Sequence, residues 1–119
     1  MKMMAKGKIY KRAINEFGET TQLGVAQEEC AELIAALSKY FRGDVDAIPK
    51  VQEEIADVEI MLEQLRMIFD RKGIDKAKKT KIQRLHFRIL SREVESHERR
   101  AQRSEEHTSE LQSRGLSRM

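Results

Sequence analysis

The sequence predicts an all-α protein built around an antiparallel pair of central helices. Apolar residues recur at helical spacing in four segments, no segment shows the alternation of a strand, and short breaks containing glycine separate the segments. Charged residues make up 36% of the 119-residue chain and apolar residues 39%, with one Pro and no Trp. This balance is typical of helices whose charged outer faces surround one modest core, so we expect a single helical domain.

The first expected helix covers residues 8–17, where apolar residues recur at every fourth position. A glycine follows it. The second helix is expected over residues 21–41, with Thr20 or Thr21 as its N-cap. The RGD segment at residues 42–44 ends this helix, because glycine readily adopts the left-handed conformation of a C-terminal cap.

The third expected helix begins at Asp46 or just after it, since Pro49 is tolerated in a first turn. It runs to about Arg71, where a Lys-Gly pair is a typical helix stop. The fourth helix begins with Asp75 as its cap and runs to about residue 100. Because the break between the second and third helices is short, we expect them to be antiparallel neighbours.

Two similar acidic segments lie on these central helices, twenty-five residues apart. Residues 27–33 read QEECAEL and residues 52–58 read QEEIADV. Each has two acids three positions apart, which share one face of a helix. The pairs are Glu29 with Glu32 and Glu54 with Asp57. Antiparallel packing would bring the four carboxylates together around a hard divalent cation such as Mg²⁺, which prefers oxygen ligands.

In helical projection, Glu54 falls inside the apolar arc of the third helix. That arc comprises Val51, Ile55, Val58, Leu62, Leu65 and Phe69. The matching stripe of the second helix comprises Ala26, Cys30, Leu33, Leu37 and Phe41, and Glu29 and Glu32 flank it. A carboxylate on an apolar face is costly unless it is paired, protonated or bound to metal. The alternatives to a metal site are a structural ion-pair network and a solvated acidic face, which suits the outward-projecting Glu28 and Glu53.

Composition excludes several classes of protein. No stretch approaches the roughly twenty apolar residues of a membrane span, and the N-terminus lacks the apolar run of a signal peptide. Cys30 is the only cysteine and is expected to be a small buried hydrophobe in a reducing compartment, which favours the cytoplasm. The net charge of +3 is too small to argue for nucleic acid, so a nucleic-acid partner is not expected.

The last residues of the chain resemble a sequence that does not come from a natural protein. Residues 103–113, RSEEHTSELQS, and the final SRM resemble a translated short-read sequencing adapter. We therefore expect the natural domain to comprise residues 1–102, and residues 103–119 to be an artefactual tail that is disordered or merely extends the last helix. His107 lies in this tail and is excluded as a ligand candidate.

The paired acidic motif resembles that of the MazG-type all-α nucleoside triphosphate pyrophosphohydrolases. The signature of that family is EExxE, a spacer, and then ExxD, and here twenty-one residues separate Glu32 from Glu54. Further similarity lies in KYFRGD (39–44), EEIADVEIMLEQL (53–65) and KIQRL (81–85). The resemblance covers about residues 9–90. It implies a four-helix MazG-like bundle completed by dimerisation, as a homodimer or tetramer.

The resemblance also implies an activity and its residues. It implies an enzyme that uses Mg²⁺, with Mn²⁺ as a possible substitute, to convert a nucleoside triphosphate or deoxynucleoside triphosphate to the monophosphate and pyrophosphate. The implied metal ligands are Glu29, Glu32, Glu54 and Asp57. Glu28 and Glu53 would be secondary, and the residue that takes the proton of the attacking water is Glu28, Glu29 or Glu53.

Cations are also needed to bind the triphosphate. Lys81, Arg84 and Arg88 form a strip on the fourth helix, and Arg42 ends the second helix. The alternative for the strip is an ordinary solvated basic face. The alternative for Arg42 is a cation that is favoured at a helix C-terminus. The competing function for the whole chain is a non-catalytic helical interaction module that retains a buried acidic cluster.

Overall fold

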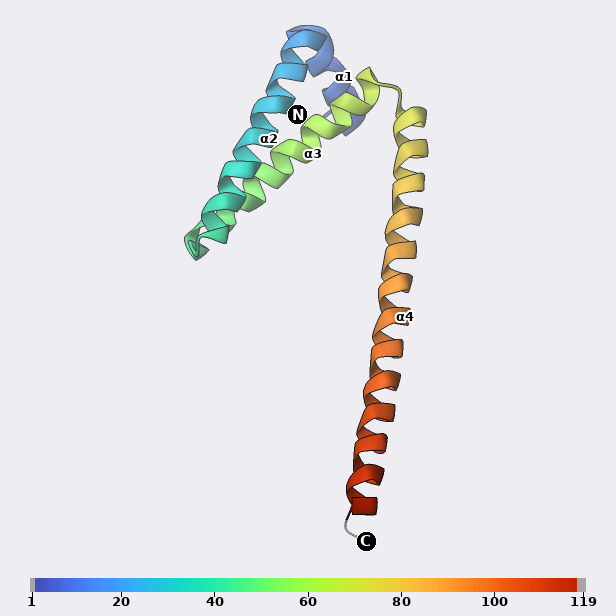
Figure 1. Ribbon diagram of the computed structural model, residues 1–119. Coiled ribbons are helices and arrows are strands. Elements are labelled where there is room, and N and C mark those ends of the chain that lie inside the picture. Colours follow the sequence, from blue (N-terminus) through green and yellow to red (C-terminus); the bar gives the residue numbers. More distant parts are fainter. Residues whose placement is uncertain (1, 118–119) are drawn as a thin grey trace. The chain divides into compact units, whose positions relative to one another are not determined.

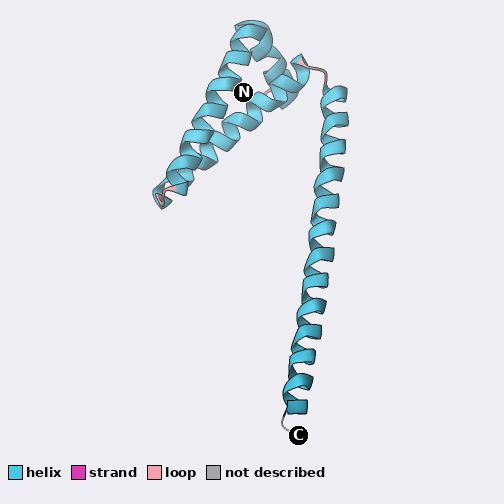
Figure 2. Ribbon diagram, in the orientation of Figure 1, coloured by secondary structure: helices cyan, strands magenta, loops and turns pink. Residues whose placement is uncertain are grey.

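The computed structural model describes residues 2–117, and the described chain is all-helical in class, with 91% helix and no strand (Figures 1 and 2). The elements are α1 (Lys6–Phe17), α2 (Glu19–Phe41), the short 3₁₀ helix η1 (Val45–Ala47), α3 (Ile48–Ile68) and α4 (Arg71–Ser117). They form two units, one ending at Ile74 and the other beginning at Asp75. The all-α prediction is confirmed.

The first unit consists of α1, α2 and α3. Helices α2 and α3 lie side by side and run in opposite directions, and α1 contacts both of them (Figure 1). This is the neighbour relationship expected from the short connection through η1. The acidic segments of the two helices therefore belong to one packed pair.

The core between α2 and α3 contains small and polar side chains. The buried residues of the first unit are Gln22, Ala26, Ala36, Ala47, Glu54, Met61 and Gln64. The Gln22 amide donates a hydrogen bond to Gln64 Oε1 at 2.7 Å, so two buried amides satisfy each other across the helix pair. Alanines at the contact allow the backbones to approach closely, which leaves little room for large side chains.

The predicted apolar stripes are buried only in part: Ala26 is buried, and Leu33, Val51, Val58 and Leu65 are partly buried. Cys30 was expected to be buried and is exposed, while Ile55 and Leu62 are 42% and 47% exposed and Phe41 is 92% exposed. The prediction was wrong because it weighted large apolar side chains. Apart from Met61, the fully buried side chains of this unit are alanine, glutamine and glutamate, and many of the larger apolar residues are exposed.

The C-terminal end of α2 and the start of α3 lie where the sequence predicted them, but the N-cap of α2 differs from the prediction. Neither Thr20 nor Thr21 caps α2, because both lie within the helix and Gly18, at φ +93°, precedes its first residue. Gly43 has φ +96°, and the Asp44 N–H donates to Lys39 O across it, so the expected left-handed cap is confirmed. Pro49 lies in the first turn of α3, as predicted.

The turn between α3 and α4 lies earlier than predicted. Helix α3 ends at Ile68, and Asp70, at φ +65°, makes the turn. The Asp70 carboxylate accepts a hydrogen bond from the Lys72 N–H at 3.2 Å, so Asp70 caps α4 in place of Asp75, which lies inside the helix. Aspartate tolerates the left-handed conformation, so the chain can turn at Asp70. The Lys-Gly pair follows this turn and lies in the first turn of α4.

From Asp75 onward the second unit is a single helix. Its apolar residues Ile82, Leu85 and Ile89 are about half exposed because this unit contains no other element to pack on them. The helix continues past residue 100 to Ser117, so the tail residues 103–117 extend it. None of the described helices is long and apolar enough to cross a membrane.

Candidate metal centre

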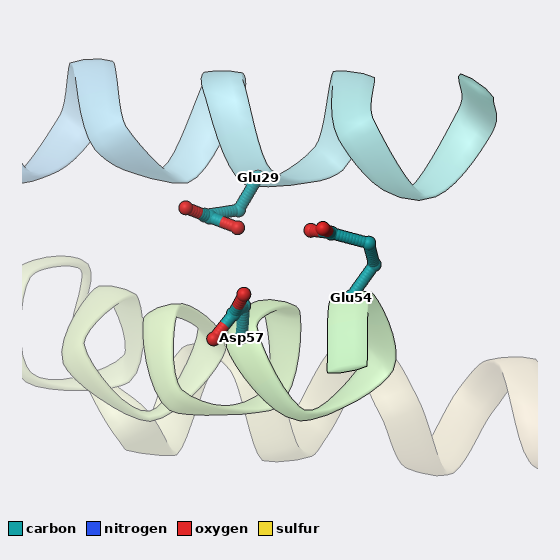
Figure 3. Close-up of side chains that lie close together, drawn as sticks. All are labelled: Glu29, Glu54 and Asp57. Carbon is teal, nitrogen blue, oxygen red and sulfur yellow. The ribbon is translucent and has the colours of Figure 1, made fainter. Parts of the chain in front are cut away.

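Three carboxylates from the two facing helices converge in the first unit. Glu29 extends from α2, and Glu54 and Asp57 extend from α3 into the space between the helices (Figure 3). Each contributes one oxygen, and the three oxygens lie within 4.8 Å of one another. Glu54 and Asp57 converge because they are three positions apart on α3, and Glu29 meets them because α2 runs antiparallel to α3.

Burial distinguishes the three acids. The Glu54 side chain is 1% exposed, Glu29 is partly buried and Asp57 is exposed. In the ionised state, Oε2 of Glu29 and Oε2 of Glu54 are buried without a hydrogen-bond partner among the described residues. Buried carboxylate oxygens without partners are unfavourable, so the fold presents two oxygens that a cation would satisfy.

Glu29 is the acid of the cluster whose pKa is raised. Burial, followed by the nearby charges of Glu32 and Asp57, raises the pKa of Glu29 from 4.5 to about 7. A carboxyl contact with Glu54 acts in the same direction. Near neutral pH a proton on Glu29 therefore relieves part of the repulsion, and a bound cation would displace that proton.

Lys50 is the residue of this site that the sequence reasoning missed. Its ammonium lies 2.8 Å from Oε1 of Glu54 and 3.8 Å from Oε2 of Glu53. Hydrogen bonding to Lys50 is the largest effect on Glu54 and lowers its pKa, while the same contact raises the pKa of Lys50. The signal was available in the sequence, because Lys50 precedes Glu54 by four positions and so lies on the same helix face.

The other predicted acids lie around the cluster. Glu32 is exposed and is outside the group of three converging oxygens, although its side chain contacts Glu54 and contributes to lowering the pKa of Glu54. Glu28 and Glu53 are exposed, as expected from their outward projection. The structure thus brings together three of the four proposed ligands and places the fourth beside them.

The predicted phosphate-binding cations lie elsewhere in the chain. Lys81, Arg84 and Arg88 are exposed on α4 in the second unit. Arg42 is exposed at the C-terminal cap of α2, where its N–H donates to Ser38 O. Their assignment to phosphate stays a prediction.

The donor set fits a hard divalent cation. All the converging atoms are carboxylate oxygens, the type of ligand that Mg²⁺ and Mn²⁺ bind, and the exposed Asp57 marks the solvent side of the group. No family model, curated protein or solved structure matched this chain.

Proposed function

We propose that this protein is a Mg²⁺-dependent hydrolase that converts a nucleoside triphosphate or deoxynucleoside triphosphate to the monophosphate and pyrophosphate. The observation that carries the proposal is the pair of buried Oε2 atoms of Glu29 and Glu54, which extend from opposite helices and, when ionised, have no hydrogen-bond partner among the described residues. The spacing of the paired acidic motif, which resembles that of the MazG-like family, supports the same assignment.

In this proposal, Glu29, Glu54 and Asp57 hold the ion and Glu32 lies beside it. The bound ion would neutralise charge on the phosphate oxygens and make a water molecule more acidic. The chain then has to accept the proton of the attacking water, and the acceptor is Glu28, Glu29 or Glu53. Burial of Glu54 fixes its orientation, while the exposed Asp57 leaves one side of the site open to substrate.

We further propose that the chain acts as a homodimer or tetramer, in which a second copy completes a MazG-like bundle. Large apolar residues recur at seven-residue intervals along α3, at Ile48, Ile55 and Leu62, and continue at its C-cap, Phe69; all are 42–58% exposed. Ile34, Leu37 and Phe41 are exposed on α2. Such a heptad stripe is typical of a helix that packs against another helix, and a second copy is its natural occupant.

One observation favours a second candidate function. The contact between Lys50 and Glu54 neutralises part of the acidic cluster without any metal. A non-catalytic interaction module could use such an ion-pair network to fix the register of α2 against α3. This candidate predicts a folded protein with no turnover.

The test is to incubate the full chain with a panel of ribonucleoside and deoxynucleoside triphosphates, in Mg²⁺ and in EDTA, and to identify the products by anion-exchange chromatography. We expect Mg²⁺-dependent monophosphate and pyrophosphate from at least one substrate. Diphosphate and inorganic phosphate as products would contradict the proposal. Absence of turnover by folded protein would favour the interaction module.

A further inference from the structure

A cavity of about 420 Å³ lies in the first unit, and two residues that contact Glu54, namely Glu32 and Lys50, line it. It is formed by the C-terminal half of α2 together with η1 and the start of α3. Its volume falls within the roughly 300–1,000 Å³ typical of small-molecule sites. Three alanines, Ala35, Ala36 and Ala47, line it, and their short side chains leave the space open between the charged residues.

Lys50 connects this cavity to the candidate metal centre. It lines the cavity and also contacts the buried Oε1 of Glu54 at 2.8 Å. An ammonium has three donors, and the Lys50 side chain is 59% exposed, so donors remain for a second partner. Glu32 is shared in the same way, because it lines the cavity and contacts Glu54.

A second cation, Lys39, lines the cavity from α2. Three acids, Glu32, Asp44 and Asp46, line it as well, and the Asp44 carboxylate accepts the Asp46 N–H at 3.0 Å and caps η1. Because the acids outnumber the two lysines, a phosphate chain would enter this cavity only together with its divalent cation. Two lysines line the cavity, and the ammonium of one of them, Lys50, contacts an acid of the candidate metal centre, an arrangement chemically suited to a magnesium–phosphate ligand. The carboxylates would bind the ion and the lysines the phosphate oxygens.

We infer that this cavity receives the phosphate chain of the substrate, with Lys39 and Lys50 as its contacts from the protein. The inference rests on the proposed function and deepens it, because it moves phosphate binding from the predicted strip on α4 to the first unit. Inorganic tripolyphosphate has the recognised chemistry without a base or sugar and can be tested without turnover.

The experiment is isothermal titration of the full chain with inorganic tripolyphosphate in excess Mn²⁺. The variants are Lys39→Met, Lys50→Met and Lys50→Arg, and the matched control is Lys8→Met on α1. We expect the affinity of each methionine variant in the cavity to fall about tenfold, because a charge-assisted hydrogen bond is lost. Lys50→Arg should retain most of the affinity, and Lys8→Met should equal the wild type.

Binding of Mn²⁺ alone separates phosphate contact from structural damage. Lys50→Met should bind Mn²⁺ at least as tightly as the wild type, since a competing cation is removed from Glu54, whereas disruption of the fold would weaken both ligands. If Lys50→Met does not fold, Lys39→Met carries the test. Unchanged tripolyphosphate affinity in the cavity variants, or an equal loss in Lys8→Met, would overturn the inference.

Failure of the cavity assignment can be distinguished from failure of the hydrolase proposal. If the wild type hydrolyses no nucleotide but the cavity variants still lose tripolyphosphate affinity, the hydrolase proposal fails and the cavity assignment stands. If the wild type is an active pyrophosphohydrolase and the cavity variants keep its KM and its tripolyphosphate affinity, the cavity assignment fails alone.

Discussion

The ammonium of Lys50 lies 2.8 Å from Oε1 of Glu54, whose Oε2 is buried without a partner in the described part of the chain. One carboxylate therefore has one oxygen held by the protein and one oxygen left for a cation. The contact also fixes the Glu54 side chain in the direction of Glu29 and Asp57 (Figure 3). Lys50 thus orders the site in the absence of metal and shares the charge of Glu54 when metal is present.

The first prediction concerns this pair. Lys50→Met leaves the Glu54 charge without its counter-ion, so the metal-free variant should melt at a lower temperature than the wild type. Mn²⁺ should then raise its melting temperature by more than it raises that of the wild type, because the cation replaces the missing charge. Differential scanning calorimetry in EDTA and in Mn²⁺ measures both effects, and equal metal-induced shifts would count against the relationship.

The second prediction is a pH dependence that originates at Glu29. Its pKa in the folded protein is about 7, above the ordinary value of 4.5, so between these values the folded state binds more protons than the unfolded state. The stability that Glu29 contributes is full below about pH 4.5 and is lost as the pH rises through about 7. Urea unfolding in EDTA should therefore show lower stability at pH 8 than at pH 5.5.

Two variants locate this effect. Glu29→Gln removes the titrating group and should flatten the profile between pH 5.5 and 8. Glu28→Gln changes the adjacent exposed acid and should leave the profile unchanged. The lowered pKa of Glu54 acts in a different window, because its contribution is lost only as the pH falls below 4.5. A wild-type profile that rises with pH across this range would contradict the assignment.

The third prediction concerns the buried amide pair. Gln64→Leu leaves the Gln22 amide buried without its partner at 2.7 Å, which should cost about 1–3 kcal/mol of unfolding free energy. The double variant with Gln22→Leu should recover part of that loss, because neither side then has an unsatisfied polar group. Chemical denaturation of the four proteins in this double-mutant cycle gives the coupling, and additive losses would show that the amides act independently.

The fourth prediction tests self-association. Lysine at Ile55 or Leu62 places a charge on the outer apolar stripe of α3 and should convert a dimer to monomers. Glu59→Lys alters an exposed polar position of the same helix and should leave the assembly intact. Light scattering coupled to gel filtration gives the mass of each. A wild type that is already monomeric at micromolar concentration would refute the proposed assembly.

Sequence patterns predicted the helices well because four-residue periodicity and the breaks at Gly18 and Gly43 are local signals. They predicted the position of Glu54 on a buried face, which is confirmed by its 1% exposure. They failed for Cys30 and Leu37, since burial in this small unit depends on which residues allow α2 and α3 to approach closely. They also missed the turn at Asp70, because a left-handed aspartate has no signal as strong as that of glycine.

The sequence predicted the acids of the candidate site but not Lys50 or the cavity. The spacing of the acids indicated that Glu29, Glu54 and Asp57 would meet, because antiparallel packing follows from a short connection. The paired acidic motif does not include Lys50, although Lys50 lies one helical turn before Glu54 and contacts it. The cavity beside it depends on three-dimensional packing of η1 against α2, which periodicity does not encode.

The central claim is that Glu29, Glu54 and Asp57 form a metal centre. Its most direct test is titration of the full chain with Mn²⁺, in which electron paramagnetic resonance measures the concentration of free ion. The wild type and the control Glu59→Gln should bind Mn²⁺ with equal affinity, and Mg²⁺ should compete. Glu29→Gln and Glu54→Gln should weaken binding by at least about tenfold. Equal Mn²⁺ affinity in all four folded proteins would contradict the account.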